Sequence, residues 1–272
     1  MASLKRALDA ACAQAATLVD EQVARDPVRF PKAYLPKSQG DAEIAGVFAA
    51  QLAFGRVDLF GPVLERLFAE MDTVGGPRAW VAACAEGGIG DGDPLVYRWF
   101  GRADFIALGV ALGRLQAAEG LGAAFTDMES GIVRLHALAP VDTAGKFFTT
   151  WFARPSQGSA CKRWCMFLRW MVRQEAPDLG IWTHLDPARL VMPVDTHVLR
   201  IAQLTGLTER KAANWKTAVE LTERLRAFSP KDPVRYDFAL AHLGISAGCT
   251  GDVSPACEGC AMRRACRVHV GR

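Results

Sequence analysis

Apolar residues recur at helical intervals along most of this chain, and no series of segments alternates with the two-residue period of strands. The pattern predicts helices over residues 1–30, 41–71, 94–116, 161–174, 195–206, 209–228 and 233–243. Prolines and glycines predict a loop over 31–40, and they divide the 41–71 segment near Gly55 and Gly61-Pro62. The expected fold class is therefore all-α.

The best-defined helix is predicted over residues 161–174, because its apolar side chains form one continuous stripe. Lys162 lies at the amino-terminal end of this helix, directly after the small and polar turn 154–160. A second helix is expected to begin near Asp195, whose carboxylate can cap it. The pattern thus places one cation and one acid at the starts of two helices.

Composition sets the size of the core. The chain has 272 residues, half of them apolar, which allows one large or two small domains with a sizeable core. The net charge of +3 does not by itself indicate a nucleic-acid partner. Residues 143–174 carry six basic side chains and no acid, and the last twelve residues carry four arginines, including Arg272, and no acid. These surfaces suit an anionic polymer, and they suit two solvated faces equally well.

No signal-peptide core and no apolar run of transmembrane length is visible in the sequence, so we expect a cytoplasmic protein with no membrane association. A reducing compartment disfavours disulfides among the eight cysteines. Cys12, Cys84, Cys161 and Cys165 are expected to be buried thiols.

The four remaining cysteines end the chain in the spacing C-x7-C-x2-C-x5-C: Cys249, Cys257, Cys260 and Cys266. Thiolates are soft ligands that suit both zinc and iron–sulfur clusters, so the spacing leaves both metals open. The helix-forming residues 262–264 make a simple zinc ribbon a poor fit.

The turn Gly158-Ser159-Ala160-Cys161-Lys162 before an apolar helix resembles the helix-hairpin-helix of base-excision DNA glycosylases. That superfamily includes endonuclease III, the adenine glycosylase and 8-oxoguanine glycosylase, and its hairpin has the form G-x-G-x-K. Ala160 replaces the second glycine here.

Three further segments match the superfamily in its own order. Ala50-Gln51 resembles a pair near the DNA-facing end of an early helix. The segment 193–198, PVDTHV, resembles the V-D-x-H motif of the catalytic aspartate, and with the following 201–203 it looks closest to 8-oxoguanine glycosylase. The helix 238–244 leading to Cys249 resembles that of endonuclease III, whose cysteine spacing, C-x6-C-x2-C-x5-C, is one residue shorter in the first gap.

The resemblance implies two helical lobes with an active-site cleft between them. Residues 1–40 and 144–272 would form one lobe with the helix-hairpin-helix and the cluster loop, and residues 41–143 a barrel-like lobe. Lys162 and Asp195 lie 33 residues apart, more than is usual in the superfamily, and the excess falls in 174–192. This insertion is expected over or beside the pocket, and it puts the identity of the substrate in doubt.

The resemblance also implies roles for individual residues. Lys162 would be the nucleophile that forms a Schiff base, and Asp195 would stabilise the positive charge that develops on the sugar. The alternatives are a lysine that donates to phosphate and an ordinary helix cap. Trp182 would stack on the extruded base in the substrate pocket. The remaining DNA contacts would come from Gln51, Gly158, Ser159, Ala160, Arg163, His197, Arg263 and Arg264.

The implied cofactor is a [4Fe–4S] cluster on Cys249, Cys257, Cys260 and Cys266, with zinc as the alternative. The implied partner is double-stranded DNA carrying a damaged or modified base, bound by a monomer. The expected activity is that of a DNA glycosylase and AP lyase, with an oxidised purine as the best candidate substrate. Two alternatives stay open: a glycosylase for a different modified base, and a non-catalytic DNA-structure or RNA-binding protein that retains the fold.

Overall fold

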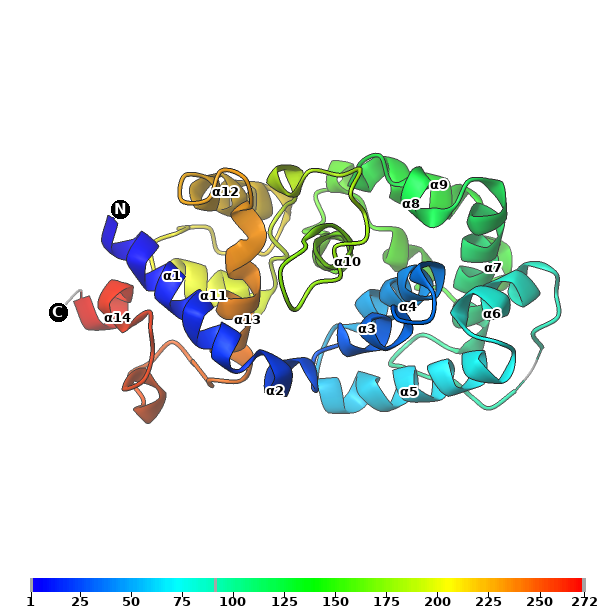
Figure 1. Cartoon of the computed structure of the whole chain (residues 1–272), viewed down its shortest axis with the longest axis horizontal. Coiled ribbons are helices and arrows are strands. Elements are labelled where there is room, and N and C mark those ends of the chain that lie inside the picture. Colours follow the sequence, from blue (N-terminus) through cyan, green and yellow to red (C-terminus); the bar gives the residue numbers. More distant parts are fainter. Residues whose placement is uncertain (1, 91, 271–272) are drawn as a thin grey trace. The chain divides into compact units, whose positions relative to one another are not determined.

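The structure is a computed structural model that describes residues 2–90 and 92–270, so Arg272 lies outside the described part. Helices account for the regular structure there, and pairing of extended backbone is confined to two isolated bridges, Tyr97–Phe100 and Ser159–Asn214. The all-α fold class is confirmed (Figure 1).

The chain divides into two compact units. Unit 1 comprises Met1–Ala24, Pro155–Arg169 and Asp186–Arg272, and unit 2 comprises Arg25–Arg154 and Trp170–Leu185. The lobe boundaries implied by the resemblance stay a prediction. The helices and 3-10 turns of unit 2 are α3 (Arg29–Tyr34), α4 (Gln39–Leu52), α5 (Val57–Thr73), α6 (Pro77–Ala85), α7 (Arg102–Ala118), α8 (Leu121–Ala124), α9 (Met128–Ala137), η1 (Val141–Thr143) and η2 (Phe148–Phe152).

Helix α4 forms the centre of unit 2. Residues 42–52 are buried without interruption, as expected for a helix surrounded by others. It packs against α3, α5, α6 and α8. Its first turn is capped by Ser38, whose Oγ accepts the Asp41 amide at 3.2 Å.

Three predictions of helix boundaries in this unit are wrong. The helix expected over 94–116 begins only at Arg102, because the preceding segment forms the turn between Tyr97 and Phe100. The expected loop 31–40 is helical at both ends, because Pro31 falls in the first turn of α3, where the proline needs no amide hydrogen. The expected break at Gly61-Pro62 is absent from α5, whose buried face continues from Phe60 to Met71. Burial of that face outweighs the cost of a proline in the helix.

The elements of unit 1 are α1 (Ala2–Thr17), α2 (Val19–Val23), η3 (Pro155–Gln157), η4 (Pro187–Arg189), α11 (Thr196–Leu204), α12 (Trp215–Arg226), η5 (Pro233–Tyr236), α13 (Asp237–Ile245), η6 (Pro255–Cys257), η7 (Arg263–Ala265) and α14 (Arg267–Val270). Helix α10 (Lys162–Val172) begins in unit 1 and ends in unit 2. Helix α13 packs against both α1 and α11. The helices predicted over 161–174 and 195–206 are confirmed as α10 and α11, whereas α12 begins six residues later than position 209.

Candidate active site

The structure brings Lys162 and Asp195 together within unit 1. Lys162 is the first residue of α10 and Asp195 is the cap of α11. The Lys162 Nζ lies 3.9 Å from Asp195 Oδ2, and each side chain is 26% exposed. The other carboxylate oxygen of Asp195, Oδ1, accepts the amides of His197 at 2.9 Å and Val198 at 3.0 Å. The predicted cap is confirmed, and the second oxygen is left to face the lysine.

The hairpin before Lys162 is a tight turn. Gly158 has a φ of +78°, a backbone conformation that glycine adopts readily, and Cys161 has a φ of +48°. A positive φ at a side chain other than glycine is strained and is held only by its surroundings. Here the Cys161 amide donates to the Ser159 Oγ at 3.2 Å, which fixes the turn next to the start of α10.

The hairpin is braced by the segment that joins α11 to α12. The Gly158 carbonyl accepts the amide of Trp215 at 3.2 Å, and Ser159 pairs with Asn214. Asn214 in turn caps α12, because its Oδ1 accepts the Thr217 amide at 3.0 Å. The hairpin and the first turn of α12 are therefore held as one piece.

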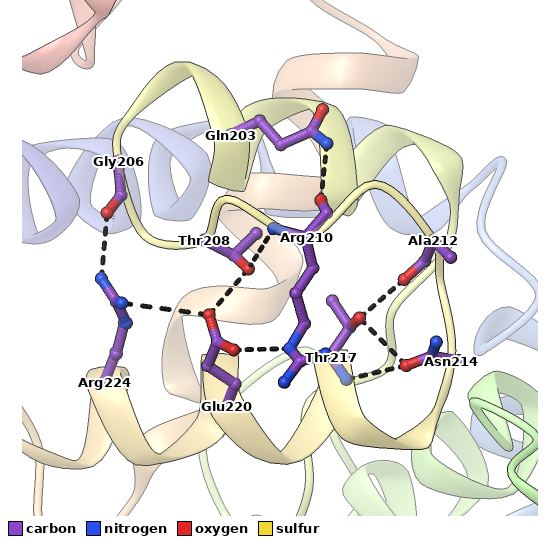
Figure 2. A network of polar contacts seen from close by, with 9 residues as sticks. All are labelled: Gln203, Gly206, Thr208, Arg210, Ala212, Asn214, Thr217, Glu220 and Arg224. Atoms are coloured by element: carbon purple, nitrogen blue, oxygen red, sulfur yellow. Dashed lines mark hydrogen bonds and ion pairs between the residues drawn. The ribbon is translucent and has the colours of Figure 1, made fainter.

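A polar network keeps this joining segment in place, as Figure 2 shows. The Glu220 carboxylate accepts from the Thr208 hydroxyl at 2.9 Å and from Arg210 Nε at 2.5 Å. The Arg210 carbonyl accepts from Gln203 Nε2 at 2.7 Å, so the network ties α11 to α12 across the loop. Its members come from α11, α12 and the loop between them, and no local sequence pattern predicts their pairing.

A buried ion pair lies close to the Lys162–Asp195 pair. Arg169, seven residues along α10 from Lys162, binds Asp237 at the start of α13, and these side chains are 4% and 5% exposed. Burial raises the pKa of the Asp237 carboxyl, Asp195 raises it further, and Arg169 and Lys162 oppose the shift. The charges of Lys162 and Asp195 thus act on the Asp237 carboxyl from the candidate site. Lys162 and Arg169 are seven residues apart in α10, a spacing that places them on one face of the helix.

The predicted phosphate contacts from the hairpin lie at its surface. Gly158 is exposed, and Ser159 and Ala160 are partly exposed. Arg163 is partly buried, and this burial lowers the pKa of its guanidinium to about 10, against an opposing effect of Cys161. His197 lies in the first turn of α11, half-buried, with its Nδ1 3.3 Å from Arg200 Nη2. Binding of DNA by these residues stays a prediction.

Gln51 and Trp182 lie inside unit 2. Gln51, in α4, is fully buried. Trp182 is 1% exposed, its Nε1 donates to Glu43 Oε1 at 2.8 Å, and its ring centroid is 5.6 Å from that of Phe125. Stacking on an extruded base would require the Trp182 ring to become exposed, so its role in a pocket stays a prediction.

The four carboxy-terminal cysteines are half-buried free thiols that follow α13. Burial raises the pKa of Cys260, a hydrogen bond with the Met262 backbone opposes the shift, and Cys249, Cys257 and Cys266 each raise the pKa further. Among the described residues, no group of three or more His, Cys, Asp or Glu side chains is placed to hold a metal ion. The thiols of these four cysteines fit the donor chemistry of iron–sulfur and zinc sites, and the binding of a metal stays a prediction.

The loop that carries these cysteines is attached to the rest of unit 1. Met262 is 2% exposed, and Gln14 of α1 donates to the Gly259 carbonyl at 3.2 Å. Arg263 and Arg264 are exposed on η7. Contact of these two arginines with phosphate groups stays a prediction.

No helix in the described part of the chain combines the length and the apolar character that crossing a membrane requires. Residues 26–246 match the model of one protein family, described as a protein of unknown function (DUF2400). Neither the curated proteins nor the solved structures contain a match to the chain.

Proposed function

The chain belongs to the DUF2400 family, and we propose that it is a base-excision DNA glycosylase with AP-lyase activity, of the helix-hairpin-helix superfamily. One observation carries the proposal: an amine and a carboxylate, 33 residues apart in sequence, lie 3.9 Å from each other at the starts of two helices. Binding to DNA alone would need a cation there, but it would not need the acid beside it.

The proposed reaction begins with a base rotated out of the duplex, because the atoms to be attacked are inaccessible inside the stack. The lone pair of the neutral Lys162 amine forms a bond to C1′ of the sugar, and the bond between C1′ and the base breaks. The base leaves with that electron pair and takes up a proton. Opening of the sugar ring gives a Schiff base between Lys162 and C1′, and loss of a proton from C2′ then expels the 3′ phosphate by β-elimination.

Asp195 supports this reaction through the oxygen that faces Lys162. Oδ1 is held by two backbone amides, so the carboxylate has a fixed orientation and does not need to reorganise during the reaction. Oδ2 can accept the proton that Lys162 loses, or it can stabilise the positive charge on the sugar. Both tasks require the negative charge and not only the shape of the side chain.

The hairpin would position the DNA backbone. Helix α10 has eleven residues, and the positive end of its dipole, at its amino terminus, favours a phosphate there. Such a contact fixes the register of the DNA without reading its sequence. Lys162 lies at the same helix end as this proposed phosphate site.

The cysteine loop would hold a metal centre in a structural role. A [4Fe–4S] cluster would be ligated by Cys249, Cys257, Cys260 and Cys266. When bound, it would stabilise a segment that has only a small hydrophobic core of its own. With the loop ordered, Arg263 and Arg264 would contact phosphates. No step of the reaction passes through the cluster.

The proposed substrate is an oxidised purine in duplex DNA, on the basis of the residues that flank Asp195. The test is incubation of the protein with duplexes that carry 8-oxoguanine, uracil, an oxidised pyrimidine or an abasic site, followed by borohydride. We expect a trapped covalent adduct that Lys162→Ala abolishes.

The matched control is Lys231→Ala, which removes an exposed lysine elsewhere in unit 1 and should leave the adduct unchanged. Base release without an adduct would restrict the activity to a glycosylase without lyase chemistry. Neither base release nor an adduct, with duplex binding intact, would replace the proposal by a non-catalytic binding protein.

A further inference from the structure

A group of aromatic and cationic side chains lies on the surface of unit 2. It consists of Phe54 after α4, Arg98 and Trp99 before α7, and Lys146 and Phe147 before η2, and we call it the aromatic platform. Trp99 is 49% exposed and Phe147 is 41% exposed, although aromatic side chains are normally buried in a core of this size.

The rings of the aromatic platform are held against each other. Trp99 stacks on Phe54 with centroids 5.8 Å apart and an interplanar angle of 29°, and it lies 5.4 Å from Phe147. The ring centroid of Trp99 also lies 5.9 Å from that of Phe100. Phe100 packs on the fully buried Trp151, with ring centroids 4.4 Å apart. Trp99 is therefore fixed by neighbours on one side while half of its surface faces solvent.

The cations of the aromatic platform lie among these rings. The Arg98 guanidinium carbon is 5.2 Å from the Phe54 centroid and 5.8 Å from that of Trp99, and Lys146 Nζ is 5.7 Å from Phe147. Neither Arg98 nor Lys146 makes an ion pair with a carboxylate among the described residues. Both charges are thus available to an anionic ligand.

The backbone conformation around Arg98 holds this residue in a tight turn at the surface of unit 2. Arg98 has a φ of +56°, and the turn that imposes it is closed by two hydrogen bonds of 3.0 Å between Tyr97 and Phe100. Gly55 leaves room for the guanidinium, because a Cβ on this glycine would lie 2.4 Å from Arg98 Nη2. A non-glycine residue in this region is strained, and such strain persists where the surrounding structure enforces it.

From these features we propose that the aromatic platform binds single-stranded DNA, with an unpaired base stacked on Trp99 and phosphates at Arg98 and Lys146. Exposed rings suit the faces of bases, which are accessible only when the bases are unpaired. Neighbouring cations without carboxylates suit the phosphate backbone. A protein partner with an apolar surface would leave both charges without a counter-ion. The site goes beyond the proposed excision of a base, and it does not depend on Lys162.

The test uses fluorescence anisotropy with a labelled oligothymidylate of about 12 nucleotides, within the usual range of sites for single strands. Trp99→Ala should weaken binding by about 10-fold or more, because stacking on an aromatic ring makes a large contribution per base. The matched control is Val96→Ala, which removes apolar surface that is 59% exposed in the same loop but has no aromatic face. This variant should bind as the wild type does.

Two further measurements separate stacking and charge from a loss of folding. Trp99→Phe keeps a ring, so it should bind within a few-fold of the wild type while losing the quenching of tryptophan fluorescence by the bound bases. Arg98→Ala and Lys146→Ala should each lower the salt dependence of binding, with the slope of log K against log salt falling by about 0.7. Thermal unfolding of each variant verifies that unit 2 is intact.

The inference is overturned if the wild type binds no oligothymidylate, or if folded Trp99→Ala binds it as the wild type does. The Lys162→Ala variant distinguishes this failure from failure of the proposed function. It should lose the borohydride adduct and keep the affinity for oligothymidylate. Trp99→Ala should lose affinity for oligothymidylate and keep the borohydride adduct on a duplex that carries an abasic site.

Discussion

The buried Arg169–Asp237 pair offers a quantitative test of how unit 1 is held together. The substitution is Arg169→Met, which keeps the length and apolar character of the side chain and removes the charge. Both partners are nearly inaccessible, at 4% and 5% exposure, so solvent cannot replace the lost guanidinium. Removing the partner of a buried carboxylate lowers the free energy of unfolding by roughly 3–5 kcal/mol, and we expect a decrease of this size near pH 7.

The penalty should depend on pH in a defined direction. Burial already raises the pKa of Asp237 above the reference value of 3.8, and removal of Arg169 takes away the main opposing effect. A carboxyl with a raised folded-state pKa contributes stability that is present below its unfolded pKa and is lost as pH rises through the folded pKa. The Arg169→Met variant should therefore recover stability on acidification, by about 1.4 kcal/mol for each unit of additional pKa shift.

The assay is urea unfolding followed by far-ultraviolet circular dichroism, repeated over a series of pH values from neutral to acidic. The double variant Arg169→Met/Asp237→Leu removes both charges and should lose much less than the single variant, since a well-packed apolar pair can replace a buried ion pair. Arg224→Met is the surface control, because its contact with Glu220 is 3.9 Å long and its side chain is 51% exposed. A loss below about 1 kcal/mol, or one with no pH dependence, would refute the reasoning.

Three further predictions concern other parts of the molecule. Burial first, and a neighbouring guanidinium second, lower the pKa of His136, so the stability it contributes is present above pH 6.5 and is lost as pH falls. His136→Phe, which keeps the stack on Phe152 at 4.8 Å, should show a flatter dependence of thermal unfolding on pH, and a curve that parallels the wild type would contradict this. Asp195→Asn keeps an oxygen for the cap, so it should change stability by less than about 1 kcal/mol while slowing borohydride adduct formation about 100-fold. Cys260→Ser should lose bound metal in elemental analysis of the purified protein, whereas Cys12→Ser should keep it, and a wild type that holds zinc without iron would remove the cluster from the proposal.

Local signals in the sequence were sufficient for α10 and α11. The apolar stripe of α10 is continuous, so its period is unambiguous, and Asp195 caps α11 through amides only two and three residues away. The fold class followed from the same kind of evidence, because helical spacing recurs along the chain. The proximity of Lys162 and Asp195 was expected from the resemblance and not from the spacing of these two residues.

Contacts between distant segments could not be predicted in this way. Asp237 is 68 residues from Arg169 in sequence, and nothing near either residue identifies its partner. The helical course of α5 through Pro62 depends on burial of a face whose neighbours come from other helices. The aromatic platform was missed for the same reason, because Phe54, Trp99 and Phe147 come from three separate segments and form a surface only in the folded unit.

The geometry of α10 connects the buried pair to the candidate site. Lys162 and Arg169 are seven residues apart, which is two turns or about 10.5 Å along the helix, so they share one face. Each meets an acid, Asp195 at the cap of α11 and Asp237 at the start of α13, and α11 packs against α13. A shift of α10 by one residue would rotate this face by about 100°. Arg169 and Asp237 would then be separated, and each would be a buried charge without its partner. The buried pair therefore fixes the register in which Lys162 reaches Asp195, and the candidate site depends on it even though both Arg169 and Asp237 are buried.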